Sequence, residues 1–176
     1  MNGCIIVIAY IIITTLHYYM WTMVRRKLTA YTDGSCLSNG RIGARAGVGV
    51  WFGRDHPDNI SEKLEGMQTN QRAEIQAAIR AIEIVYQKAP SRIEELEILT
   101  DSNYVVKAMN EWILKWRVNN YHNVKNAILF RRLDNLRLTL HEEMGITTTF
   151  AHVSAHTGIE GNEGADQLAN QGALLT

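Results

Sequence analysis

The sequence LEILTDS at residues 96–102 decides the fold class of this chain. Its first five residues form a short, mainly apolar run that predicts a β-strand. The run ends on an acid, Asp101, and Ser102 is placed to cap a helix that begins at once. Because a strand that continues through a helix into a further strand returns in the same direction, this segment predicts a parallel strand pair.

Upstream of this segment, the sequence predicts an antiparallel meander. Residues 28–35, LTAYTDGS, alternate apolar and polar side chains and stop at Asp33, as a half-buried strand that ends in a turn does. Residues 46–53 and 59–66 are expected to form two more strands, joined by a turn at 55–58. A helix is then expected before LEILTDS.

That helix is predicted by apolar residues at helical spacing from Asn70 to Lys88. Thr69 or Asn70 is its expected N-cap, and Pro90 lies beyond its end. The helix therefore separates the meander from the strand at 96–100.

Beyond LEILTDS, a helix is expected to about Trp116, followed by a polar break at 119–120 and a second helix that ends at Gly145. A strand at 147–152 and a final helix from about 161 complete the chain. The expected fold class is therefore α/β: a mixed five-stranded sheet, with three antiparallel strands and then parallel additions, flanked by helices.

Size and composition are those of one ordinary domain. The 176 residues are 46% hydrophobic, and 18 Lys and Arg balance 18 Asp and Glu, so net charge alone predicts no polyanionic partner. Two cysteines, Cys4 and Cys36, exclude a disulfide framework and indicate a reducing compartment. We expect an intracellular monomer of the nucleus or cytoplasm without an obligate protein partner; a mitochondrial or membrane-anchored protein is the alternative.

The N-terminal extension is the compositional exception. Residues 4–24 carry no Asp, Glu, Lys or Arg, and three basic residues follow at 25–27. This length and flank suit a signal-anchor that contacts a membrane. An extra strand or helix packed on the domain, or an extension from an alternative start, is the other interpretation. The chain is therefore divided into an apolar extension, 1–27, and one domain, 28–176.

Four acids stand at places where the expected fold would gather them. Asp33 and Asp101 each end a strand, and the carboxyl ends of parallel strands meet at one edge of a sheet. Glu74, in the first turn of the helix between them, can reach that edge. Asp166 lies early in the last helix, on a face expected to turn inward. Taken singly, each acid also suits turn chemistry or the helix dipole.

Carboxylates gathered without basic partners repel one another, and a hard divalent cation neutralises them. Carboxylate oxygens with retained waters are the ligands that suit Mg²⁺. Two ions roughly 3.5–4 Å apart can stabilise both the attacking water and the departing oxygen of a phosphodiester. The acids therefore predict hydrolytic phosphoryl transfer.

The chain carries five short motifs: YTDGS (31–35), QTNQRAE (68–74), LTDS (99–102), HVSAHTG (152–158) and GNEGAD (161–166). In this order they resemble the motifs of the type 1 ribonuclease H family, and TNQRAE is most similar to the animal enzymes. The resemblance covers residues 28–173. It implies a ribonuclease H-like fold and an endonuclease that cuts the RNA strand of RNA/DNA hybrids with two Mg²⁺ ions, for which Mn²⁺ can substitute.

The resemblance also implies catalytic roles. Four acids would bind the metal ions: Asp33, Glu74, Asp101 and Asp166. His156, on a loop with Gly158 and Gly161, would assist product departure, and an imidazole suits proton transfer near neutral pH. His152 is expected to be a buried, hydrogen-bonded strand histidine rather than a metal ligand.

Substrate contacts of three kinds follow from the resemblance. Three amides would read 2′-hydroxyls across the minor groove: Asn39, Asn70 and Gln71. Three aromatics would form a channel for the DNA strand: Tyr104, Trp112 and Trp116. A DNA-phosphate pocket is implied at Thr69 and Asn126, where Met67 replaces the Arg of most animal members. The tryptophans, at i and i+4, would otherwise be ordinary core.

Local charge favours the nucleic-acid interpretation. Seven Lys or Arg (107, 115, 117, 125, 131, 132 and 137) stand against two acids (111 and 134) between residues 102 and 137. Two rival interpretations stay open: a catalytically weak or inactive hybrid-binding module of the same fold, and a nuclease of this fold with another substrate. The presence of all four acids opposes the first.

Overall fold

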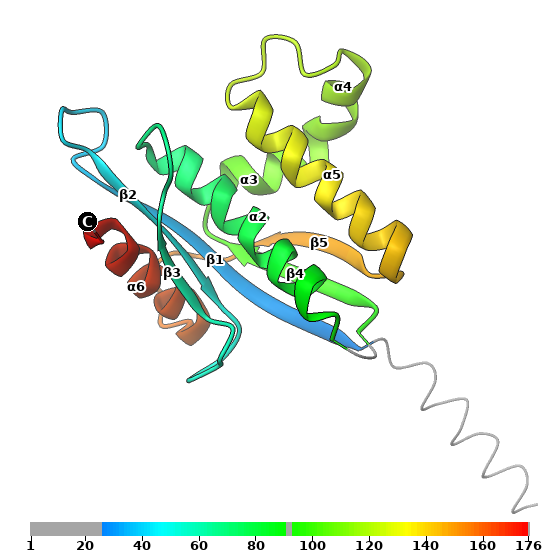
Figure 1. Cartoon of the computed structure of the whole chain (residues 1–176), viewed down its shortest axis with the longest axis horizontal. Coiled ribbons are helices and arrows are strands. Elements are labelled where there is room, and N and C mark those ends of the chain that lie inside the picture. The colour runs from blue at the N-terminus through cyan, green and yellow to red at the C-terminus, as the bar shows by residue number, and fades with distance from the viewer. Residues whose placement is uncertain (1–25, 91–92, 176) are drawn as a thin grey trace, which may run out of the picture.

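The computed structural model describes residues 26–90 and 93–175, which form one sheet with helices packed on it (Figure 1). The apolar segment at 4–24, with both of its interpretations, lies outside these residues. Across the described part of the chain, no helix is long and apolar enough to cross a membrane.

The five strands form a single mixed sheet in the order β3-β2-β1-β4-β5. They are β1 (Lys27–Leu37), β2 (Arg45–Trp51), β3 (Ile60–Lys63), β4 (Glu95–Thr100) and β5 (Thr147–His152). β1 pairs antiparallel with β2 and parallel with β4, and β5 extends the parallel side. The expected α/β class, with a meander followed by parallel additions, is confirmed.

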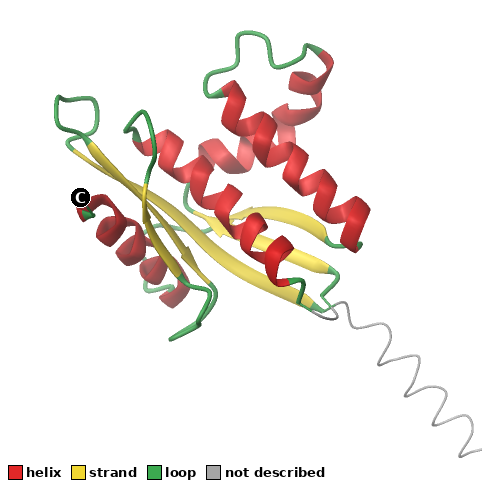
Figure 2. Ribbon diagram, in the orientation of Figure 1, coloured by secondary structure: helices red, strands yellow, loops and turns green. Residues whose placement is uncertain are grey.

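Helices cover both faces of this sheet (Figure 2). They are α2 (Asn70–Lys88), α3 (Asn103–Lys107), the π-helical turn η1 (Ala108–Trp112), α4 (Ile113–Val118), α5 (Ala127–Met144) and α6 (Glu160–Leu174). α2 and α5 pack together on one face, and α6 packs on β1 and β2 from the other. The main core lies between the sheet and the α2–α5 layer. Its largest fully buried side chains include Phe130, Ile75, Ile79, Ile82, Leu96, Ile98, Leu133 and Leu140.

Side-chain caps set the starts of two helices that lead to the candidate site. The Thr69 hydroxyl accepts a hydrogen bond from the backbone N–H of Arg72 at 3.4 Å, at the start of α2. The Ser102 hydroxyl accepts one from Val105 at 3.3 Å, at the start of α3. Both caps agree with the sequence expectation.

Three boundaries differ from those expected. β1 continues past Asp33 as far as Leu37, because its pairing with β2 continues to that residue. β3 covers only residues 60–63. The helix expected up to Trp116 is divided into α3, η1 and α4, because a π-helical turn interrupts it. Such a turn inserts a residue without any compositional signal, so periodicity does not reveal it.

Glycines in β2 allow α6 to lie directly on the sheet. A Cβ atom on Gly47 would lie 2.1 Å from the backbone oxygen of Ala169, and one on Gly49 would lie 2.2 Å from that of Ala165. No side chain fits into such a gap without displacing the helix. This close approach holds α6, and with it Asp166, against the strand layer.

Gly47→Ala should therefore lower the free energy of unfolding by about 2–4 kcal/mol, because the methyl group forces α6 away from β2. Urea unfolding, followed by circular dichroism, measures this loss. Gly53→Ala is the matched control, since its Cβ would meet only the Cβ of His56, at 3.9 Å. Equal stability of the two variants would contradict the inferred close packing.

Candidate active site

Two acids come to one edge of the sheet because the parallel pairing of β1 with β4 stops two residues before each of them. In the pairing of β1 with β4, Tyr31 lies opposite Leu99. Asp33 and Asp101 each follow two residues further along, so they come to the same edge of the sheet. Asp33 remains within β1 and is 8% exposed, whereas Asp101 follows the end of β4.

Glu74 reaches this edge from α2, which lies against β1 at Gly34. A Cβ on Gly34 would lie 2.1 Å from the backbone nitrogen of Glu74, so only glycine permits this approach. The Glu74 carboxylate accepts hydrogen bonds from the Ser102 hydroxyl at 2.6 Å and from the Asn70 side-chain amide at 2.8 Å. Because Ser102 follows Asp101, its hydroxyl links the helix acid to the end of β4.

The last acid, Asp166, is held from within α6. It accepts a hydrogen bond from the Asn170 side-chain nitrogen at 3.1 Å, and the side-chain oxygen Oδ1 of Asn170 accepts one from the Ser35 hydroxyl of β1 at 2.5 Å. The Asn162 side-chain amide, also on α6, donates to Asp101 at 3.4 Å. Sequence reasoning missed these orienting amides, although Asn162 belongs to the GNEGAD motif.

Burial and like charge together raise the pKa of Asp33 to about 7. Desolvation is the largest cause, and the neighbouring carboxylates of Asp101, Asp166 and Glu74 add to it. Burial also raises the pKa of Glu74, although the hydrogen bond from Ser102 favours its charged form. The four acids therefore lie within electrostatic reach of one another.

The acids nevertheless do not converge on one point. Within residues 26–90 and 93–175, no three His, Cys, Asp or Glu side chains form a ready-made metal site. Three of the carboxylates, those of Glu74, Asp101 and Asp166, are held instead by the amides and the hydroxyl described above, which agrees with the mutual repulsion of the acids. The donor set, the desolvated Asp33 with three further carboxylates near it, suits a hard divalent cation.

Two histidines lie at the end of β5 and in the segment that joins it to α6. His156 is exposed and has a positive φ of 53°, and Gly158 follows with a φ of 81°. The Gly158 N–H donates to the Glu163 carboxylate at 3.1 Å. His152 is the last residue of β5, as expected, but its side chain is exposed, so the expectation of a buried histidine is wrong. His152 is exposed because it stands at the end of the edge strand β5, where the core no longer covers the side chains.

The amides assigned to the RNA strand lie at the start of α2. Asn39, in the loop between β1 and β2, accepts a hydrogen bond from the backbone N–H of Asn70 at 3.3 Å. Gln71 follows on the same helical turn. The structure therefore brings Asn39 and Asn70 together, next to Glu74.

The aromatic residues form a connected group around Phe130 of α5. The ring centroids of Tyr104 and Phe130 are 5.1 Å apart, as are those of Trp116 and Phe130. The ring centroids of Trp112 and Trp116 are 5.7 Å apart, with the ring planes tilted by 50°. Tyr104, Trp112 and Trp116 are each half-buried, so they join the core and still present a surface.

The two residues of the implied phosphate pocket, Thr69 and Asn126, stand at the starts of the neighbouring helices α2 and α5. Thr69 caps α2, and Asn126 precedes α5 with a φ of 59°. The side-chain amide nitrogen of Asn126 is buried beside Tyr104, and within the described residues it has no hydrogen bond of normal geometry. Met67, at 69% exposure, offers no charge to a phosphate.

Asp33→Asn should stabilise the metal-free protein, because it removes a buried carboxylate that three others repel. The parent loses stability as the pH rises from the ordinary carboxyl pKa of 3.8 to above the folded pKa of about 7, since ionised Asp33 disfavours the fold. The gain in the variant should be on the order of 2–4 kcal/mol at pH 8.5 and near zero at pH 4.

Urea unfolding in EDTA at both pH values measures this difference. Asp55→Asn, at an exposed loop acid, is the control and should change little. A loss of stability in Asp33→Asn at pH 8.5 would show a structural role for this carboxylate.

Comparison with known proteins identifies the family. The RNase H family model matches residues 25–174. Ribonuclease H1 of Mus musculus is 41% identical over 148 residues, which cover 81% of this chain and 49% of the mouse protein. Ribonuclease H of Francisella philomiragia is 34% identical over 155 residues, which cover 84% of this chain and 91% of the bacterial protein.

Among solved structures, the foamy viral protease-reverse transcriptase in complex with an RNA/DNA hybrid is similar, with a TM-score of 0.64 and 27% identity. The match covers 84% of this chain and 20% of the viral chain. The chain spans about half the length of its mammalian relatives. Family model, motif order and sheet topology agree, and the chain belongs to the type 1 ribonuclease H family.

Proposed function

We propose that this chain is an endonuclease that hydrolyses the RNA strand of RNA/DNA hybrids with two Mg²⁺ ions, for which Mn²⁺ can substitute. One observation carries the proposal: Asp33 is buried beside the carboxylates of Asp101, Asp166 and Glu74, so that burial first, and the like charges second, raise its pKa to about 7. A fold retains such repulsion at a cost in stability, and a divalent cation offsets that cost. Members of this family depend on divalent metals.

The chain's own residues would prepare the site for the ions. We assign metal binding to Asp33, Glu74, Asp101 and Asp166. When bound, the ions would lower the pKa of a water molecule and stabilise the departing oxygen of the phosphodiester. Hydrogen bonds from Ser102 and Asn70 to Glu74, and from Asn162 to Asp101, support this assignment, because they orient the carboxylates before any ion arrives.

His156 is assigned to proton transfer as the product leaves. It is exposed beside the start of α6, and an imidazole can carry a proton near neutral pH. Its positive φ sets the direction of the side chain, since the next residues turn at Gly158.

Substrate selection rests on the two surfaces beside the acids. Asn39, Asn70 and Gln71, next to Glu74, would contact 2′-hydroxyls of the RNA strand. Tyr104, Trp112 and Trp116 would pack against deoxyribose, where a 2′-hydroxyl would clash. The mouse relative is named ribonuclease H1, and the foamy viral structure holds an RNA/DNA hybrid, which supports this substrate.

We further infer that residues 28–176 form the catalytic domain. The compact sheet and its core lie within this range, and the family match covers nearly all of it. A monomer of the nucleus or cytoplasm stays an expectation, with a mitochondrial or membrane-anchored protein as the alternative. Thr69 and Asn126 are assigned to a DNA phosphate, as the family resemblance implies; they stand at the starts of α2 and α5, and helix N-termini favour anions.

Asp101→Asn is expected to abolish hydrolysis while leaving hybrid binding in Ca²⁺ within about threefold, because the acids hold the ions and other surfaces hold the duplex. A labelled RNA/DNA hybrid, double-stranded RNA, double-stranded DNA and single-stranded RNA, each with and without Mg²⁺, form the assay. The parent should cut only the hybrid, and only with the metal. Asp55→Asn serves as the control.

Persistent cleavage by Asp101→Asn would contradict the assignment of Asp101 as a metal ligand. Hybrid binding by the parent without cleavage would favour the binding module instead. Equal cutting of double-stranded RNA would contradict the assigned substrate.

Met67→Arg tests the phosphate pocket. Each phosphate neutralised adds roughly 0.9 to the slope of log affinity against log salt on a B-form duplex, so the variant should steepen that slope by about this amount. Binding should tighten at low salt by ~1–3 kcal/mol, because a guanidinium forms charge-assisted hydrogen bonds with a phosphate. Met67→Gln, which is polar but uncharged, is the control, and the measurement is a salt series in Ca²⁺. An unchanged slope would mean that position 67 does not face a phosphate.

A further inference from the structure

Asp134 of α5 is a buried acid that takes no part in the carboxylate cluster. It is 1% exposed, and Arg117 of α4 donates to both of its carboxylate oxygens at 2.5 Å. The Tyr121 hydroxyl donates at 2.7 Å, and Arg137 of the same helix donates at 3.1 Å. Burial alone would raise the pKa of Asp134, but the hydrogen bonds from Arg117 and its other partners hold it below its usual value. The carboxylate is therefore charged and well satisfied in the fold.

Two of these three partners lie in the segment that carries the aromatic channel. Arg117 directly follows Trp116, and the backbone N–H of Tyr121 donates to the Trp116 carbonyl oxygen at 2.7 Å. Asp134 thus binds the chain on both sides of the turn that ends α4.

The face of α5 that carries Asp134 also contacts the aromatic channel directly, through Phe130. Phe130, four residues before Asp134 and fully buried, contacts the rings of Tyr104 and Trp116. Residues four apart lie on one face of a helix. α5 therefore supports the channel at two points, by an apolar contact at Phe130 and by an ionic one at Asp134.

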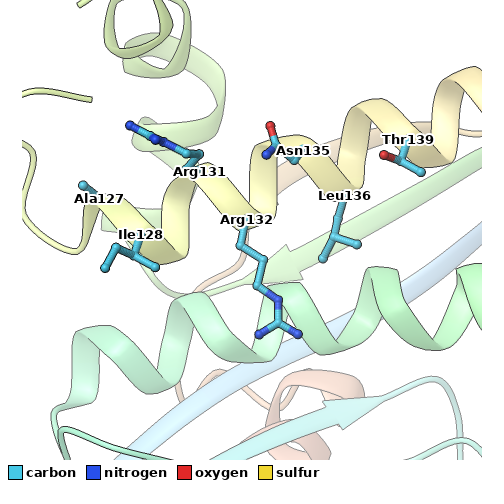
Figure 3. A pocket seen from close by; sticks show the side chains of 7 residues that line it. All are labelled: Ala127, Ile128, Arg131, Arg132, Asn135, Leu136 and Thr139. Atoms are coloured by element: carbon cyan, nitrogen blue, oxygen red, sulfur yellow. The ribbon is translucent and has the colours of Figure 1, made fainter. Parts of the chain in front are cut away.

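The turn after α4 needs such support because its backbone is unfavourable. Asn120 and Tyr121 have φ values of 54° and 59°, in the left-handed region that bulky residues rarely adopt. Arg131 lies over the Tyr121 ring at 5.0 Å and donates to the Asn120 carbonyl oxygen at 2.8 Å. In Figure 3, Arg131 points away from α2, whereas the neighbouring Arg132 points toward it.

We propose that Asp134 is the positioning residue of the aromatic channel: by fixing Arg117 and Tyr121 it sets where Trp112 and Trp116 meet the DNA strand, and so contributes to strand selection. The inference rests on the proposed function. It predicts that removing the hydrogen bonds of Asp134 weakens hybrid binding and lowers the preference for hybrid over double-stranded RNA. The turnover number kcat should stay unchanged, because the four acids are not affected.

Tyr121→Phe and Asp134→Asn test the proposal in the full chain. Tyr121→Phe removes one hydrogen bond and keeps the ring, so it is the variant expected to fold if Asp134→Asn does not. Glu83→Gln is the matched control: Glu83 is a half-buried α2 carboxylate that likewise accepts from two arginines, Arg80 and Arg132, and it contacts none of the channel rings. Hybrid and double-stranded RNA affinity in Ca²⁺, kcat, KM and Tm are measured for each.

The Asp134 and Tyr121 variants should raise KM and the hybrid Kd about fivefold to twentyfold and lower the preference for hybrid over double-stranded RNA, with kcat within about twofold. Glu83→Gln should lower Tm without changing Kd or the preference. If Tyr121→Phe loses stability like the control but keeps Kd and preference, Asp134 is only a structural anchor and the proposal is overturned. Failure of the parent itself to bind the hybrid would instead overturn the proposed function, and this inference with it.

Discussion

The parallel pairing of β1 with β4 is the constraint on which the candidate site depends. It places Tyr31 opposite Leu99 and therefore carries Asp33 and Asp101 to one edge. Side chains alternate between the faces of a strand, so a shift of one residue would send one of these acids to the opposite face. Gly34 then lets α2 approach closely enough to add Glu74 to the same edge.

Hydrogen-bonding residues around the acids balance a repulsion that the fold does not remove. Ser102 and Asn162 hold Glu74 and Asp101 with neutral groups, which orient the carboxylates without neutralising them. A lysine or arginine in these places would stabilise the fold and fill the position that a cation needs. The neutral partners therefore preserve the charge of the cluster, and the rest of the domain supplies the stability that the cluster takes away.

Asp134 shows the opposite arrangement within the same small domain. Its carboxylate is paired with two guanidinium groups and a phenol, which makes it a fixed anchor rather than a ligand. The contrast separates the two tasks proposed for the protein. Acids without cationic partners, in β1 and after β4, would serve the chemistry, and a paired acid on α5 would hold the surface that meets the DNA strand. The two sites lie on different elements, so each can be altered without the other.

What the sequence alone determined about this protein depends on how far apart in the chain the interacting residues lie. The strands that carry Asp33 and lead to Asp101, the caps at Thr69 and Ser102, and the mixed sheet follow from periodicity and capping, which act over a few neighbouring residues. The continuation of β1 past Asp33 does not, because it depends on pairing with β2. The partners of the acids do not: Ser35 meets Asn170 only through the packing of α6 on β2, across 135 positions. Likewise the π-helical turn, the exposure of His152 and the anchoring by Asp134 were decided by tertiary structure alone, because register and helix packing depend on contacts between distant residues that local sequence patterns do not encode.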